Sequence, residues 1–185
     1  LRAPREAAAP PAPPEAPASA HITATLFYVD GDGTMLVPFR REVTLGQGTV
    51  EQGRRILLAQ LRDAPPAGLV NPVPDGTSLR AFFVTGTGDA FVDLSAEAAS
   101  NHPGGSQSEL LTVYSVIHAV TDNLPAVKRV QILVNGREVD TLAGHVDLRQ
   151  PLDPDPTLVR DPDAPPSAAA DARSAPPAAG LTATP

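Results

Sequence analysis

The side chains that could support acid–base or metal chemistry are few. They are three histidines and four carboxylates: His102, His118, His145, Asp93, Glu97, Asp140 and Asp147. Histidine titrates near neutral pH and is a common metal ligand, and His145 and Asp147 would share one side of an extended strand. The sequence contains neither an HExxH nor a GxSxG motif, and its carboxylates and histidines have no repeated spacing. We therefore predict no catalytic residues, no metal site and no cofactor.

Glycine-containing loops in the second half are better candidates for binding. Gly104-Gly105-Ser106 precedes a predicted helix, whose free amides could hold an anion. The GK[ST] ending of a nucleotide-binding loop is missing, and Glu109 would add a negative charge to the first turn. The pattern Ser106-x-x-Glu109 therefore favours a capping box. The predicted binding residues are His102, Gly104, Gly105, Ser106, Glu109, Gly144, His145 and Asp147.

The sequence Asp30-Gly31-Asp32-Gly33 suggests a calcium loop at first sight. An EF-hand loop needs oxygen ligands at positions 5 and 12 and glycine at position 6. Here those positions are Thr34, Arg41 and Met35. We therefore predict an ordinary hairpin turn.

Composition excludes several function classes. The net charge is −7, and basic residues occur only as isolated pairs such as Arg54-Arg55, which argues against a nucleic-acid groove. The chain has no cysteine, so it has no disulfide, no thiolate metal site and no cysteine nucleophile. No run of about 18 apolar residues is present to span a bilayer. Any membrane attachment is expected through an anchor upstream of Leu1.

Proline marks the predicted domain boundaries. Of 22 prolines, six lie in residues 1–20 and nine in 151–185, which leaves seven between them. Proline fixes φ and removes a backbone donor, so it opposes helix and sheet. We predict a disordered Pro/Ala-rich linker at 1–20, one domain at 21–150 and a disordered Pro/Ala-rich tail at 151–185.

Periodicity within the domain predicts three hairpins that alternate with two helices. Apolar residues recur at three- and four-residue spacing in both predicted helices, and Asn135-Gly136 is a strong turn signal. Thr49-x-x-Gln52 has the form of a capping box, and Pro38 indicates a sheet edge or a bulge. The predicted strands are 23–29, 35–43, 78–84, 90–94, 130–134 and 137–141, with a short extended piece at 146–148, and the helices are 49–62 and 107–123.

This order predicts an α+β fold. We expect a single compact domain with a largely antiparallel sheet of about five to six strands and two helices on one face. The disordered tails would flank it.

Several short motifs follow one another in a fixed order in the second half. They are FVDLS (91–95), HPGGS (102–106), ELLTVY (109–114), VQILVNG (130–136) and LAGHVD (142–147). The pattern resembles the GerMN domain of GerM-type sporulation and spore germination proteins over about residues 22–150, and most closely over 91–148. The resemblance implies an extracytoplasmic domain, tethered to a bacterial membrane by an N-terminal helix or lipid anchor, with no established enzymatic activity. The Pro/Ala tails and the single domain copy differ from the two-domain spore protein.

The leading hypothesis is a non-enzymatic interaction or assembly module of the cell envelope. Its partners would be envelope proteins or another copy of the chain, and its contacts an exposed sheet edge and the loops Asn101–Ser106 and Leu142–Val146. An alternative is an accessory domain that binds cell-wall glycan or peptide through polar groups around His102 and His145. An enzyme is the least favoured class.

Overall fold

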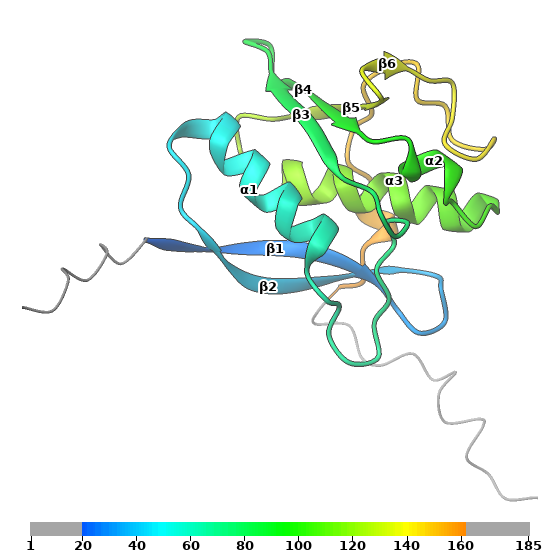
Figure 1. The fold of residues 1–185 in the computed structure, drawn as a ribbon. Helices are drawn as coiled ribbons and strands as arrows, with labels where there is room; N and C mark the ends of the chain where they lie inside the picture. Colours follow the sequence, from blue (N-terminus) through cyan, green and yellow to red (C-terminus); the bar gives the residue numbers. More distant parts are fainter. Residues whose placement is uncertain (1–19, 162–185) are drawn as a thin grey trace, which may run out of the picture.

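The computed structural model describes residues 20–161 of the 185-residue chain and has the predicted α+β architecture (Figure 1). The predicted tail residues 1–19 and 162–185 lie outside the described part. In chain order the elements are β1 (His21–Val29), β2 (Leu36–Thr44), α1 (Gly48–Arg62), β3 (Leu79–Val84), β4 (Asp89–Leu94), α2 (Glu97–Ser100), α3 (Ser106–Thr121), β5 (Arg129–Val134), β6 (Arg137–Glu138) and the 3₁₀ helix η1 (Pro156–Leu158).

The strands form two sheets instead of the single sheet that we predicted. β1 and β2 make an antiparallel hairpin, and the second sheet has the order β3-β4-β5-β6. β4 and β5 are parallel, because α2 and α3 carry the chain back before β5 begins. α1 and α3 lie between the hairpin and the four-stranded sheet, so each helix is covered on both sides (Figure 1).

The inner edge of β1 explains why the hairpin stands apart from the other strands. The amide and carbonyl of Thr25 bond to the carboxamide of Asn123 at 2.8 and 2.7 Å. Those of Phe27 bond to the carboxamide of Gln60 at 2.8 and 2.7 Å, and Val29 exchanges two backbone bonds of 2.9 Å with Val70. The side chains of Asn123 and Gln60 and the backbone of Val70 thus take the place of a neighbouring strand.

The other edge of the hairpin confirms the prediction for Pro38. Pro38 lies opposite Phe27 in the hairpin, and the backbone N–H and C=O of Phe27 point away from β2. In an antiparallel pair, the backbone groups of Pro38 therefore point away from β1, toward the outer edge of the hairpin. A residue without an N–H group fits that position, because no ladder bond is lost there.

Both predicted capping boxes are wrong. α1 begins at Gly48, and Thr49 makes no capping hydrogen bond. Instead the side chains of Glu51 and Gln52 reach back and accept from the amides of Gln47 and Gly46, at 2.8 and 2.7 Å. The start of α3 has no side-chain cap either.

Within residues 20–161, no helix is both long and apolar enough to cross a bilayer.

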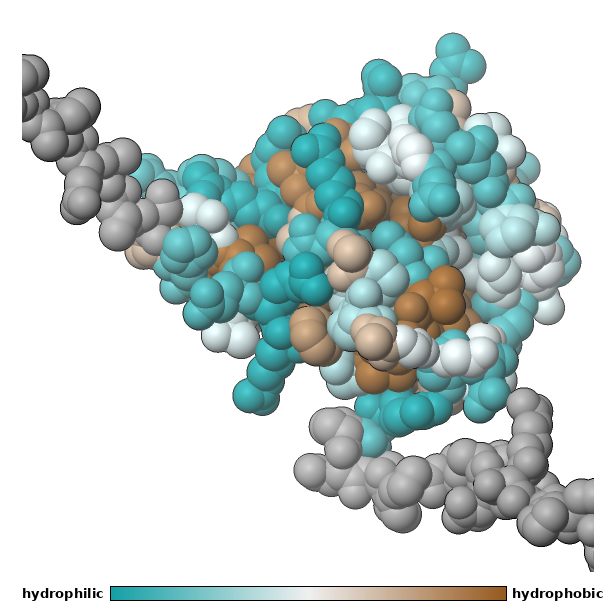
Figure 2. All heavy atoms as spheres, turned by 60° about the horizontal axis from the view of Figure 1, so that its bottom comes forward, coloured by the Kyte–Doolittle hydropathy of each residue, from teal (hydrophilic) through white to brown (hydrophobic). Residues whose placement is uncertain are grey.

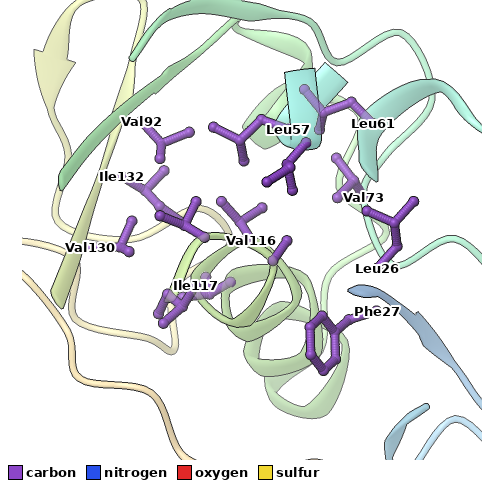
Figure 3. Packing of buried hydrophobic residues seen from close by; sticks show 14 of the residues in the cluster. Leu26, Phe27, Leu57, Leu61, Val73, Val92, Val116, Ile117, Val130 and Ile132 are labelled. Atoms are coloured by element: carbon purple, nitrogen blue, oxygen red, sulfur yellow. The ribbon is translucent and has the colours of Figure 1, made fainter. Parts of the chain in front are cut away.

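The core fills the space around the two helices. Leu26, Leu57 and Ile132 are fully or almost fully buried, and Figure 3 shows them with neighbours from both sheets. α1 approaches β3 so closely that a Cβ on Gly53 would lie 2.3 Å from the ring of Phe82. Glycine inside this helix therefore serves packing, which offsets its poor helix propensity.

Residues 151–161 belong to the folded domain, so the predicted boundary at 150 lies too early. Leu152 exchanges two backbone bonds with Val130, and the amide of Arg160 donates to the carbonyl of Leu36. The Arg160 side chain also pairs with the buried carboxylate of Asp30. The extended piece that we expected at 146–148 forms no strand.

Replacing Gln60 tests the pairing of the β1 edge. Gln60→Met keeps the length of the side chain but leaves the buried amide and carbonyl of Phe27 unpaired. We expect the free energy of unfolding to fall by about 2–4 kcal/mol in urea titrations. Gln47→Met, at an exposed position, is the control and should change it by less than about 0.5 kcal/mol. Equal losses in the two variants would contradict this role of Gln60.

Candidate functional site

Glu109, which we expected to cap α3, is a fully buried carboxylate that holds a distant loop. Its Oε1 accepts from the amides of Leu142 and Ala143 at 2.8 and 2.9 Å. Its Oε2 accepts from the amide of His145 at 2.8 Å and lies 3.1 Å from the ring Nδ1 of the same residue. The carboxylate thus fixes the predicted contact loop Leu142–Val146 against α3.

The charge of Glu109 is stabilised by these contacts. Burial alone would raise its pKa, but the amides of Ala143, His145 and Leu142 and the His145 ring together lower it below the usual value. Four donors occupy the two oxygens, which leaves little capacity to accept a proton from a substrate. Glu109 therefore positions the loop and is a poor candidate for a general base.

His102 holds the loop before α3 in a similar way. Its Nδ1 accepts from the amide of Gly104 at 3.0 Å, so its Nε2 carries the proton and faces the Thr112 hydroxyl at 3.1 Å. That hydroxyl lies 2.6 Å from the carbonyl of Pro72. Burial lowers the pKa of His102, which favours this neutral form. His102 and Thr112 together thus connect α3 to two loops.

The other predicted binding residues do not join one cluster. Gly104 and Gly105 have φ values of 85° and 89°, and Ser106 begins α3 at the surface. The amide of Gly144 donates to Thr141 Oγ1. Asp147 pairs with Arg149, whose hydrogen bonds and charge lower the pKa of Asp147 to about 2. Among residues 20–161, no three His, Asp or Glu side chains are placed to hold a metal ion.

A hollow of about 720 Å³ opens where the predicted contact loop Asn101–Ser106 meets residues 65–75. Its apolar lining comes from four aliphatic side chains and four prolines: Val29, Val70, Val73, Leu111, Pro65, Pro72, Pro74 and Pro103. This volume and this apolar character are typical of ligand pockets. Figure 2, which brings the bottom of Figure 1 forward, shows hydrophobic residues within a largely hydrophilic surface.

Three carboxamides shape the rim of the hollow. Asn101 donates to the carbonyl of Asp75 at 2.9 Å, and Gln107 donates to the carbonyl of Thr34 at 3.0 Å. The carboxamide oxygen of Asn71 accepts from the amide of Val73 at 3.0 Å. The first bond joins the loop before α3 to the segment 63–76, the second joins α3 to the β1–β2 turn, and the third lies within the segment 63–76. Of these segments, we predicted only Asn101–Ser106 as a contact.

Glu109→Gln tests the buried carboxylate. The new amide group would face two donors, so we expect a loss of about 2–3 kcal/mol in unfolding free energy at pH 7. Because the folded pKa of Glu109 is lowered, its contribution is complete above the unfolded pKa and is lost as the pH falls through the folded value. The difference from the unmutated chain should therefore shrink below about pH 4 in urea titrations. Glu138→Gln, at an exposed site, is the control, and a difference independent of pH would contradict the assignment.

Comparison with solved structures shows a shared fold. The "Putative Lipoprotein" from Clostridium perfringens is 24% identical with a TM-score of 0.52, and the match covers 72% of this chain and 87% of that one. The first GerMN domain of the sporulation protein GerM from Bacillus subtilis is 18% identical with a TM-score of 0.52, covering 72% and 96%. The tandem GerMN domains of the same protein are 18% identical to this chain with a TM-score of 0.59. The match covers 72% of this chain and 46% of the tandem domains, so the chain spans about half of their length.

Family membership rests on the sequence. None of the curated proteins matches the chain. The model of the Germane family, described as sporulation and spore germination, matches residues 25–140, which include part of β1, all of β2, both long helices and all four strands of the second sheet. This match spans more than half of the chain, and the GerMN structures have the same fold. The chain therefore belongs to the Germane family, as the predicted resemblance to GerMN domains implied.

Proposed function

We propose that the chain is a non-enzymatic interaction or assembly module of the bacterial cell envelope, located outside the cytoplasm and held at the membrane by a lipid or helical anchor. The family description, sporulation and spore germination, supports an envelope process. The fold shared with a protein described as a putative lipoprotein supports anchoring.

The apolar hollow is the observation that carries this proposal. The acid–base groups of Glu109 and His102 are engaged in hydrogen bonds that hold loops, and neither residue lines the hollow. The hollow instead presents mainly aliphatic side chains, prolines and neutral carboxamides, with Asp75 as its one carboxylate, and this lining suits an apolar segment of a partner protein. Val70 is 57% exposed there, so its side chain is available for contact.

Val70→Glu tests the hollow as the contact. Its backbone bonds to Val29 can persist, whereas a charge would enter the apolar lining. With a photo-crosslinking residue at Ser108, we expect an adduct to an envelope protein in intact envelopes, and a loss of about tenfold in Val70→Glu.

Phe83→Glu is the matched control, because Phe83 is 60% exposed on β3 and does not line the hollow. It should leave the adduct unchanged. An equal loss in both variants, or no adduct from Ser108, would contradict the proposal.

A second candidate function is binding of cell-wall glycan or peptide. The carboxamides of Asn71, Asn101 and Gln107 around the hollow are the kind of group that binds sugar hydroxyls and peptide bonds. Sedimentation with purified peptidoglycan separates the candidates. Protein assembly predicts no pelleting above a control without peptidoglycan, and pelleting that Val70→Glu abolishes would favour the wall ligand.

A further inference from the structure

The outward side of α1 combines exposed apolar residues with arginines. We define the α1 face as Leu45, Val50, Arg54, Arg55 and Arg62, together with Phe39 and Arg41 of β2. Leu45, Val50 and Phe39 are 49%, 43% and 37% exposed, and they make up three of the five exposed large hydrophobic residues in residues 20–161. In α1 the buried side carries Ile56, Leu57 and Leu61, so the arginines face away from the core.

The charge of this region is opposite to that of the rest of the chain. Residues 39–63 contain five arginines and three acidic residues, whereas the other described residues contain six basic and fourteen acidic side chains. Arg55 pairs with Glu51, and Arg41 pairs with Asp63. Arg54 and Arg62 have no ion-pair partner among the residues that the structure describes. The α1 face is therefore a local positive surface on an acidic protein.

The N-terminal segment joins the domain at the same place. The carbonyl of Ala20 accepts from the amide of Leu45 at 2.7 Å, so Ala20, the first described residue, lies beside one end of the α1 face. A tether that runs from this point to an anchor would bring the α1 face to the anchoring surface at high effective concentration.

We infer that the α1 face lies against the phosphate headgroups of an anionic bilayer. The inference rests on the membrane-tethered location in the proposed function and adds an orientation to it. The guanidinium groups of Arg54 and Arg62 meet lipid phosphates, while Leu45 and Val50 enter the headgroup region. The guanidinium of Arg41 lies 5.6 Å from the ring centre of Phe39 and can keep that contact at the interface. The acidic remainder of the chain disfavours the other orientations.

Vesicle binding of the full chain tests the inference. We expect binding to vesicles with 30% phosphatidylglycerol to exceed binding to pure phosphatidylcholine, and to weaken as salt is raised. Arg54→Gln with Arg62→Gln should lower the partition coefficient by about 25-fold, because each arginine near an anionic surface strengthens binding about fivefold. Glutamine has nearly the helix propensity of arginine, so α1 is retained.

Lys128→Gln with Arg137→Gln is the matched control. Both residues are exposed, have no ion-pair partner within residues 20–161 and lie outside the α1 face. This variant removes the same charge, and it should change partitioning less than about twofold. An equal fall in the two variants, or equal binding to both kinds of vesicle, would overturn the inference.

The absence of cysteine and tryptophan permits a second readout in the tethered state. Leu1→Cys can be coupled to a maleimide lipid, and a single tryptophan then reports depth through quenching by brominated lipid. Val50→Trp should be quenched, whereas Phe83→Trp, exposed on β3, should not. Equal quenching would contradict the orientation.

These lipid experiments use no partner protein, so they can fail while crosslinking at the hollow succeeds, and the reverse also holds. The alternative occupant of the α1 face is an acidic protein, and a different pattern of results would identify it. In that case the arginine double variant would lose a crosslinked partner although the unmutated chain did not bind anionic vesicles, and the bilayer inference would be wrong.

Discussion

The fold depends on the pairing of one strand edge inside the core. Because backbone polar groups must be bonded when they are buried, the inner edge of β1 needs a partner at Thr25, Phe27 and Val29. Asn123, Gln60 and Val70 supply it from three different parts of the chain. One row of hydrogen bonds thus ties the hairpin to the α1 and α3 segments and to the loop that forms one wall of the hollow.

Buried ionisable groups have a related task elsewhere in the domain. Glu109 binds three amides of the loop 142–145, and Asp30 accepts from the amides of Thr34 and Met35 while it pairs with Arg160. Burial would raise the pKa of Asp30, and its hydrogen bonds lower it below the usual value. Such carboxylates stabilise irregular backbone and stay ionised to do so. This use explains how a domain with several buried acids can present a largely apolar hollow that none of these buried acids lines.

Local patterns were enough to predict the hairpins and the two long helices but not their partners. Turn sequences such as Asp30-Gly31-Asp32-Gly33 and Asn135-Gly136 identified hairpins, and the three- and four-residue spacing identified α1 and α3. The division into two sheets depends on Gln60 and Asn123, and nothing in the sequence near either residue indicates that its carboxamide replaces a strand. Glu109 fits the local rule for a capping residue, yet distant amides compete for it more successfully. Residues 151–161 have the composition of a tail, whereas Leu152 and Arg160 pair with strands far away in the sequence.

The proposed contacts are arranged along the hairpin. β1 begins beside Leu45, where the N-terminal segment enters, and ends at Val29, which lines the hollow. Nine residues at about 3.3 Å each separate these points by about 30 Å. A domain that rests on its α1 face therefore keeps the Val29 end of the hollow away from its tether. The hollow would then remain open to a protein held at the same membrane.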